Sequence, residues 1–389
     1  MQHPIRLLTA VPICDGHDSA INTINLEFIR NGIEVVYMGF HRSVSDVVRA
    51  AIQEDVRAVG ISTYNGGHVE FFHEIREGLG RAGASHIGLF GGGGGTISQT
   101  DAKLMKRQGT DEIFFPGATL DSMVRFVNEA YGKPRKPGCE VSPDGCLARA
   151  LTRIEERRAI GVRPAKRRRP RVIGVTGPGG AGKTTLIDEL VLRFLNDGIE
   201  QPGRPARAHA TPARRSRRVA ILSHDPSIVG DGALLGDRAT MINSQDDRVF
   251  MRSMATRGRS GGLSPATEGC LKHLTKQDFE LIFLETVGTG QEALPFRSDQ
   301  FDETVLVLNP DYGAQLQLQK IAMIDVAGVV VVNKADQPRA KAAAAELGRR
   351  LSLNGKSQKL VMAEARRHRD SGVDSLYGIV NPQDGGNAA

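Results

Sequence analysis

RVIGVTGPGGAGKTT, residues 171–185, decides the fold of the C-terminal part of this chain. The apolar run RVIGVT predicts a strand, and the apolar run LIDELVLRFL at 186–195 predicts a helix. Between them lies the pattern G-x-x-x-x-G-K-T, whose glycines leave backbone N–H groups free to surround phosphates at a helix N-terminus. Lys183 is expected to reach the terminal phosphates, and the Thr184 hydroxyl is expected to bind magnesium. The stretch therefore predicts a P-loop.

A tetrapeptide further along the chain predicts which nucleotide base is bound. Asn333-Lys334-Ala335-Asp336 follows the apolar run GVVVV, and a carboxylate at its end can accept from both the ring N–H and the amine of guanine, whereas adenine offers no such pair. GTP and GDP are therefore predicted over ATP. The residues expected to bind the nucleotide are Gly177, Gly179, Gly180, Ala181, Gly182, Lys183, Thr184, Thr185, Asn333, Lys334 and Asp336.

Strand patterns divide the chain in two. Apolar runs alternate with amphipathic stretches over the first 132 residues, and a second series continues from the P-loop with VAILSHD, LIFLETVG, ETVLVLNP, GVVVVNKAD and KLVMAEA. The fold class is α/β, with two doubly wound parallel-sheet domains, one flavodoxin-like and one a P-loop GTPase. We place these domains at 1–132 and 171–389, with a basic linker at 133–170.

Composition excludes several classes of protein. The net charge of +7 is concentrated in two segments, one from 133–138 through 165–171 and the other at 201–218. Their composition cannot bury apolar surface, so they are interpreted as solvated linker and loop. No recognition helix accompanies the charge, so no nucleic-acid partner is expected. No run of about 18 apolar residues occurs, so no membrane partner is expected and the predicted compartment is the cytoplasm. The four cysteines lack metal-site spacing and are expected to be free thiols.

The N-terminal half carries its own candidate site at strand ends. Asp15-Gly16-His17-Asp18 follows the first predicted strand, Ser62 follows another, and a run of glycines extends over 91–95. A doubly wound sheet brings these positions to one rim. A loop histidine with an aspartate behind it suits a metal ion, although singly the histidine could be an ordinary loop residue and the glycines a flexible turn.

Together these residues resemble the cobalamin-binding signature D-x-H-x-x-G, S-x-L, G-G of base-off/His-on corrinoid proteins. The resemblance implies that His17 is the lower cobalt ligand with Asp15 behind it. It also implies that Ser62, Gly91 and Gly92 line the slot for the nucleotide tail of the cofactor. The sequence departs from the signature at Ala20, where the family has Gly, and at Tyr64, where it has Leu.

Four further stretches are similar to the G-protein chaperones of methylmalonyl-CoA mutase and to the G-domain of fused isobutyryl-CoA mutases. They are DPS at 225–227, LGDR at 235–238, MRSMATR at 251–257 and ETVGTGQ at 285–291. The resemblance implies that Asp225, Asp237 and Glu285 join Thr184 around Mg²⁺, with Lys183, Asp237 and Glu285 catalytic. Segment 227–232 is shorter and less basic than in the family, and the last guanine loop is expected near 363–366.

The expected function combines both sites. A mutase needs a (β/α)₈ barrel of about 250 residues, for which this sequence has no room. The predicted activity is therefore GTP hydrolysis. It is expected to assist a separate acyl-CoA mutase domain or subunit in loading or protecting adenosylcobalamin. The alternatives are a cobalamin carrier with a degenerate GTPase, an N-terminal fragment of a fused mutase, a methyl-transfer corrinoid protein and a nickel metallochaperone. The oligomeric state stays open, with a homodimer as one option.

Overall fold

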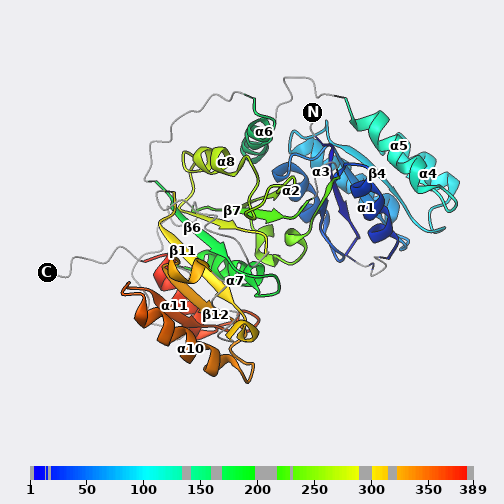
Figure 1. Cartoon of the computed structure of the whole chain (residues 1–389). Helices are drawn as coiled ribbons and strands as arrows, with labels where there is room; N and C mark the ends of the chain where they lie inside the picture. Colours follow the sequence, from blue (N-terminus) through cyan, green and yellow to red (C-terminus); the bar gives the residue numbers. More distant parts are fainter. Residues whose placement is uncertain are drawn as a thin grey trace. The chain divides into compact units, whose positions relative to one another are not determined.

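A computed structural model describes residues 4–13, 15, 19–133, 142–158, 169–197, 217–227, 231–288, 300–313 and 322–382. The chain forms two compact units (Figure 1). The first comprises 1–161 with segments 225–239 and 251–258, and the second comprises 162–224, 240–250 and 259–389. No helix in the described part of the chain is long and apolar enough to cross a membrane.

The first unit is built on a parallel sheet with the strand order β5-β4-β3-β1-β2-β8. Its strands are β1 (Arg6–Ala10), β2 (Glu34–Tyr37), β3 (Ala58–Ser62), β4 (Gly88–Gly92), β5 (Glu112–Phe114) and β8 (Ala233–Leu235). The helices that precede residue 133 are α1 (Ser19–Arg30), α2 (Val44–Gln53), α3 (His68–Arg81), α4 (Gln99–Arg107) and α5 (Leu120–Tyr131). Since the strand order reverses between β1 and β3, the carboxyl ends of these two strands mark the switch point where ligands bind in such sheets.

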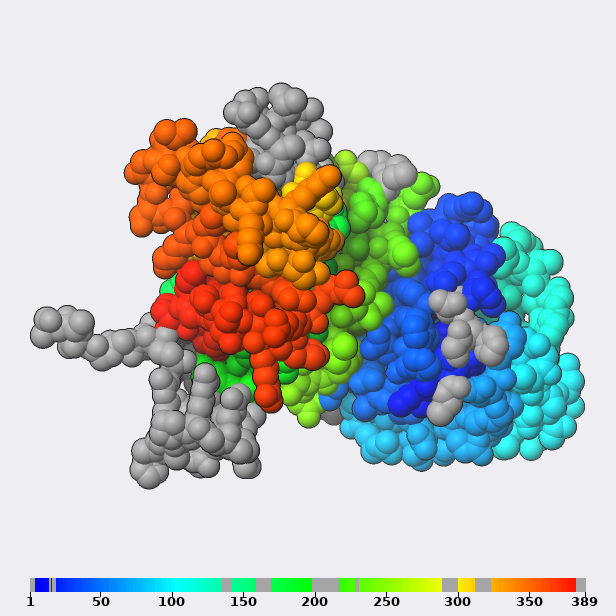
Figure 2. All heavy atoms as spheres, turned by 90° about the horizontal axis from the view of Figure 1, so that it is seen from below, coloured from blue at the N-terminus to red at the C-terminus, as the bar shows by residue number. Residues whose placement is uncertain are grey.

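Local sequence explains where two of these helices begin. Ser43 and Ser98 are N-caps, and each accepts from the backbone N–H of an aspartate three residues later. Asp46 and Asp101 bond back to the serine N–H groups, which completes a capping box at both helices. Figure 2 shows α4 and α5, in cyan, at the surface of this unit. The apolar faces of the helices fill two buried clusters on the sheet.

The second unit is built on most of a seven-stranded sheet with the order β13-β12-β11-β6-β10-β7-β9, of which the last residue of β7 and residues 251–255 of β9 are counted in the first unit. Its strands are β6 (Arg171–Thr176), β7 (Val219–Asp225), β9 (Val249–Ala255), β10 (Leu281–Glu285), β11 (Glu303–Leu308), β12 (Val329–Val332) and β13 (Lys359–Met362). Its α-helices are α7 (Lys183–Asn196), α8 (Thr267–Leu274), α10 (Ala340–Leu353) and α11 (Ser371–Val380). The short 3₁₀ helices among the described residues are η2 (Asp237–Ala239) in the first unit and η3 (Ile242–Gln245), η4 (Pro310–Gly313) and η5 (Ala322–Asp325) in the second. Both α10, in orange, and α11, in red, reach the surface (Figure 2). The two-domain α/β class predicted from the sequence is confirmed.

The stretch expected as a basic linker contains an ordered helix, α6 (Pro143–Glu155). Ser142 caps its first turn, and α6 packs against α2, where the Gln53 side chain donates to Asp144 at 3.0 Å. This half of the stretch is therefore part of the first unit, because one face of α6 is apolar enough to be buried. Residues 134–141 and 159–168, which carry much of the basic charge, lie outside the described residues.

Candidate functional site

The P-loop between β6 and α7 depends on glycine for its backbone. Gly177, Gly180 and Gly182 have φ values of 142°, 73° and 87°, in the region that side chains disfavour. A Cβ on Gly177 would lie 2.0 Å from the Val307 carbonyl oxygen, and one on Gly182 would lie 2.4 Å from Nδ2 of Asn333. Neighbouring strands therefore approach the loop closely, and the pattern G-x-x-x-x-G-K-T is required for packing as well as for phosphate.

Lys183 lies at the start of α7 with a buried side chain, 7% exposed. Its ammonium donates to the Gly177 carbonyl at 3.1 Å and to the Pro178 carbonyl at 3.3 Å. A Cβ on Gly288 would lie 2.8 Å from this Nζ and 2.6 Å from the Gly179 nitrogen. The segment that follows β10 and contains Gly288 therefore lies directly beside the phosphate-binding loop.

Two hydroxyl groups converge on the carboxylate of Glu285, which is 2% exposed at the end of β10. Thr184 donates to Oε1 at 2.8 Å, and Ser223 donates to Oε2 at 3.3 Å. Hydroxyl and carboxylate oxygens are the ligand types that Mg²⁺ prefers, so these donors fit that ion. Sequence reasoning missed Ser223, whose only signal was its place near the end of an apolar strand.

The guanine tetrad lies after β12. Asn333 is 2% exposed, donates from Nδ2 to the Ala181 carbonyl at 2.9 Å and accepts from the Ala365 N–H at 3.1 Å. It therefore ties the P-loop to the loop after β13, the loop that the sequence assigned to guanine. Lys334 has a φ of 56°, and Asp336 is exposed.

The remaining predicted nucleotide-site acids belong to the first unit. Asp225 accepts from the Gly236 N–H at 3.2 Å through its carboxylate, and its carbonyl accepts from Thr256 N–H at 3.1 Å. Asp237 begins the short helix η2. Across the described ranges, no group of three or more His, Cys, Asp or Glu side chains could hold a metal ion. The roles of Asp225 and Asp237 at Mg²⁺ stay predictions.

In the first unit, Asp15 and Ser62 come together at the switch point. Asp15 is 1% exposed after β1, and its carboxylate accepts from the backbone N–H of Tyr64, just past β3. Ser62 is buried at the end of β3. His17, the predicted cobalt ligand, lies outside the described residues, as do Gly16 and Asp18.

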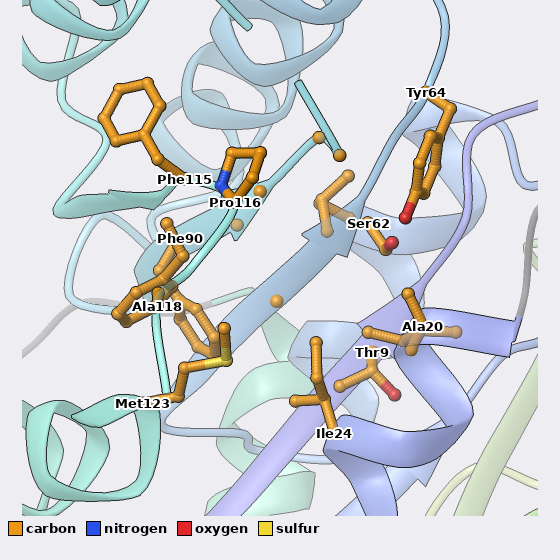
Figure 3. Close-up of a pocket in the computed structure, with 18 of the residues that line it drawn as sticks. Thr9, Ala20, Ile24, Ser62, Tyr64, Phe90, Phe115, Pro116, Ala118 and Met123 are labelled. Atoms are coloured by element: carbon orange, nitrogen blue, oxygen red, sulfur yellow. The ribbon is translucent and has the colours of Figure 1, made fainter. Parts of the chain in front are cut away.

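A cavity of about 190 Å³ opens at this edge of the sheet (Figure 3). Ile24 and Met123 line one side, and Ser62 and Tyr64 lie at the other side of the view. The wall also includes Thr9 of β1, which is fully buried and whose hydroxyl has no hydrogen-bond partner within the described structure. The lining suits a ligand with an apolar part and a polar atom near Thr9, and the sequence predicts the nucleotide tail of cobalamin here.

The glycine run lines the cavity but does not simply leave space for a ligand. A Cβ on Gly91 would meet the Ile61 carbonyl oxygen at 2.3 Å and the Phe72 ring at 2.6 Å, and one on Gly92 would meet the Phe114 carbonyl oxygen at 2.8 Å. The protein itself fills these spaces. Glycine is needed here so that β4 can pack against its neighbours while its backbone faces the cavity.

Sequence reasoning missed a buried ion-pair network in the first unit. Glu155 of α6 accepts from Arg6 of β1 at 3.2 Å, from Arg252 at 2.6 Å and from Arg257 at 3.0 Å. Arg6 and Arg257 also contact Glu34, while Arg238 donates to Glu54 at 3.1 Å. Arg238, Arg252 and Arg257 come from the LGDR and MRSMATR stretches. These stretches therefore help to build the unit that carries the cobalamin signature.

Comparison with known proteins finds a family match for each half of the chain. Residues 5–122 match the model of the B12 binding domain, and residues 207–382 match that of the methylmalonyl-CoA mutase-associated GTPase MeaB. These families support cobalamin as a ligand of the first and GTP or GDP as ligands of the second.

Several curated proteins are similar to this chain. The chain is 37% identical to the fused isobutyryl-CoA mutase of Geobacillus kaustophilus over 86% of this chain and 31% of the relative. It is 34% identical to that of Nocardia farcinica over 96% of this chain and 36% of the relative. A mouse protein, methylmalonic aciduria type A homolog, is 28% identical over 56% of this chain and 51% of its own length. The chain spans about a third of the length of the fused relatives. It therefore combines a B12-binding domain with a MeaB-type GTPase domain and is homologous, over most of its length, to part of the fused isobutyryl-CoA mutases.

Proposed function

We propose that this chain hydrolyses GTP and binds adenosylcobalamin, and that hydrolysis controls loading, retention or exchange of the cofactor on an acyl-CoA mutase of the isobutyryl-CoA or methylmalonyl-CoA type. The observation that carries the proposal is the contact of Thr184 with Glu285 at 2.8 Å, beside a P-loop in which a Cβ on Gly177 or Gly182 would clash with neighbouring atoms. The mutase chemistry is assigned to a separate domain or subunit.

In the second unit, catalysis consists of positioning and charge neutralisation, since phosphoryl transfer asks little covalent chemistry of the protein. The P-loop N–H groups would hold the phosphates, and the Lys183 ammonium would leave its carbonyl partners for the terminal phosphates. Mg²⁺, when bound, would neutralise charge on the phosphate oxygens. Thr184 and Glu285 would hold that ion, and Glu285 would orient the attacking water. Asp225 and Asp237 are assigned to the same ion by resemblance.

In the first unit, His17 would bind cobalt, and Asp15 would accept its other ring proton. The carboxylate of Asp15 is already fixed by the Tyr64 N–H, which suits a group that orients a ligand. Ser62, Gly91 and Gly92 would line the slot for the tail base. Cobalamin supplies the radical chemistry of the mutase when it is bound.

A combined titration and turnover experiment tests the proposal. Purified protein should hydrolyse GTP only with Mg²⁺ and bind GTP at least about 100-fold more tightly than ATP, because the wrong base leaves the carboxylate of Asp336 without its donors. Asp336→Asn should reduce that ratio, and Lys183→Ala should abolish nucleotide binding while cobalamin binding persists. Equal affinity of the unmutated protein for ATP and GTP would refute the base assignment.

His17→Ala tests the cobalamin half. The unmutated protein should give a His-on absorption spectrum with adenosylcobalamin, and the variant should lose that spectrum. Asp15→Asn should weaken binding by about 10–100-fold, because the ligand stays but loses its partner. An unchanged spectrum and affinity in His17→Ala would require another cobalt ligand.

A further inference from the structure

His224 has a defined place beside the nucleotide site to which neither the sequence motifs nor the P-loop chemistry assigns a role. It is the penultimate residue of β7 and is 2% exposed. Its Nδ1 lies 2.8 Å from the carbonyl oxygen of Glu285, and its Nε2 lies 2.7 Å from Oγ1 of Thr267. Both ring nitrogens are thus engaged by groups of the same unit.

The partners restrict where the ring carries its proton. A carbonyl oxygen only accepts, so Nδ1 must donate to Glu285. The Thr267 hydroxyl at the start of α8 donates to the Ser264 carbonyl oxygen at 2.8 Å, and its oxygen lies 2.7 Å from Nε2. The imidazole therefore has a polar partner at each edge, one at a strand end and one at a helix start.

The carbonyl that His224 holds belongs to the residue whose side chain meets Thr184. Beyond Glu285, the chain leaves the strand, with Thr286 N–H donating to Val175 at 3.0 Å and Val287 N–H donating to Gly262 at 3.1 Å. A shift of the Glu285 backbone would move its carboxylate away from the Thr184 hydroxyl. Errors of about 1 Å in such a group can cost about 100-fold in rate.

We propose that His224 is a positioning residue for GTP hydrolysis, which fixes the Glu285 backbone so that the carboxylate and the Thr184 hydroxyl form one magnesium-binding pair. This inference rests on the proposed function and assigns a residue that acts through Glu285 without touching the nucleotide. The contact with Thr267 brings α8 to the other edge of the ring, whereas the positioning role depends on the contact with Glu285. A buried histidine with a merely structural role would affect stability without a selective effect on turnover.

Two conservative variants separate the contacts. In His224→Asn the amide nitrogen is bonded to Cγ, as Nδ1 is, so this variant can keep the bond to Glu285 while losing Thr267. In His224→Gln the polar atoms lie one bond further out, so this variant can reach Thr267 but not Glu285. His224→Ala loses both contacts. Thr267→Val loses the Nε2 contact and the hydroxyl bond to the Ser264 carbonyl, but it leaves the contact between His224 and Glu285 in place.

The experiment measures kcat and KM for GTP, the Mg²⁺ concentration at half-maximal rate and the unfolding midpoint of each full-length variant. His224→Ala and His224→Gln should lose about 10–100-fold in kcat and need more Mg²⁺, with a smaller change in KM. His224→Asn should recover most of the rate, and Thr267→Val should stay near wild type. His273→Asn is the matched control, since His273 is a buried histidine of α8 whose described contacts are to Gln277.

The outcomes distinguish a failure of the positioning role of His224 from a failure of the proposed function. If the wild type hydrolyses GTP and His224→Ala keeps its kcat and Mg²⁺ requirement, the positioning role is wrong and the proposed function stands. Loss of rate in both His224→Ala and His224→Asn, with folding retained, would also contradict the role assigned to the Glu285 contact. If the wild type shows no GTP hydrolysis, the proposed function itself fails, and the inference fails with it.

Discussion

Arg252 donates from Nη2 to Oε1 of Glu155 at 2.6 Å, and each side chain is 1% exposed. One partner comes from the MRSMATR stretch of the GTPase family pattern, and the other ends helix α6, in a stretch expected to be linker. Arg6 and Arg257 share the second carboxylate oxygen of Glu155, so one carboxylate holds three guanidinium groups. Buried ion pairs therefore hold the segment at 251–258 within the first unit.

Removing this carboxylate should strongly destabilise the first unit. Glu155→Gln leaves three arginines short of a counter-charge, and breaking a buried pair in this way typically costs about 3–5 kcal/mol. Urea denaturation followed by circular dichroism measures the loss. Glu129→Gln, on the exposed side of α5, is the matched control and should stay within about 0.5 kcal/mol of wild type. Equal midpoints for the two variants would contradict this account.

The same residue predicts a pH dependence. Burial raises the pKa of Glu155, but the guanidinium groups of Arg6, Arg252 and Arg257 outweigh it and lower the pKa from 4.5 to about 2. Because the folded state releases this proton at lower pH than the unfolded state, the stabilisation is complete above about pH 4.5 and is lost as the pH falls through about 2. The stability difference between wild type and Glu155→Gln should shrink across this window by an amount on the order of 3 kcal/mol. A difference that stays constant from pH 7 to pH 3 would show that the lowered pKa is wrong.

Thr9→Val should have opposite effects on the free protein and on ligand binding. The Thr9 hydroxyl is buried without a partner in the described structure, so its removal should stabilise the free protein by about 1 kcal/mol. If the tail base of cobalamin bonds to it, affinity should fall about 10-fold, the equivalent of one lost hydrogen bond. Thermal unfolding and absorption titration provide the two measurements.

Thr176→Val is the comparison for that variant, because the Thr176 hydroxyl lies 2.9 Å from that of Thr286 in the second unit. This change should lower stability and leave cobalamin affinity unaltered. Unchanged cobalamin affinity in Thr9→Val would mean that the tail does not reach Thr9.

Two glycines of the P-loop should differ in their tolerance of alanine. Gly180 and Gly182 both have positive φ, so both variants strain the backbone. A Cβ on Gly180 meets nothing within 4 Å, whereas one on Gly182 would lie 2.4 Å from Nδ2 of Asn333. Gly182→Ala should therefore weaken GDP binding at least about 10-fold more than Gly180→Ala, since the clash displaces the guanine-side loop. Fluorescence titration with labelled GDP measures this ratio, and similar affinities would argue against the contact with Asn333.

Much of the fold and of the nucleotide site could be predicted from the sequence. Most strands of both sheets are short, mainly apolar runs, because a parallel sheet covered on both faces buries most of their residues. The P-loop and the tetrad at 333–336 could be identified because phosphate and guanine recognition require particular residue types at short, fixed spacings. The contact of Thr184 with Glu285 joins two stretches that the sequence had already assigned to magnesium.

Other features were decided only by the tertiary structure. Glu155 lies 149 residues from Arg6 and 97 from Arg252, and no local pattern links them. The same holds for His224, whose partners at Glu285 and Thr267 are 61 and 43 residues away, and for the Phe72 ring that occupies the space beside Gly91. Sequence determined which chemistry each loop can perform, because that depends on residue type and spacing. Packing determined which distant charges, rings and hydroxyl groups meet, because a buried polar group takes its partner from whichever element the fold places beside it.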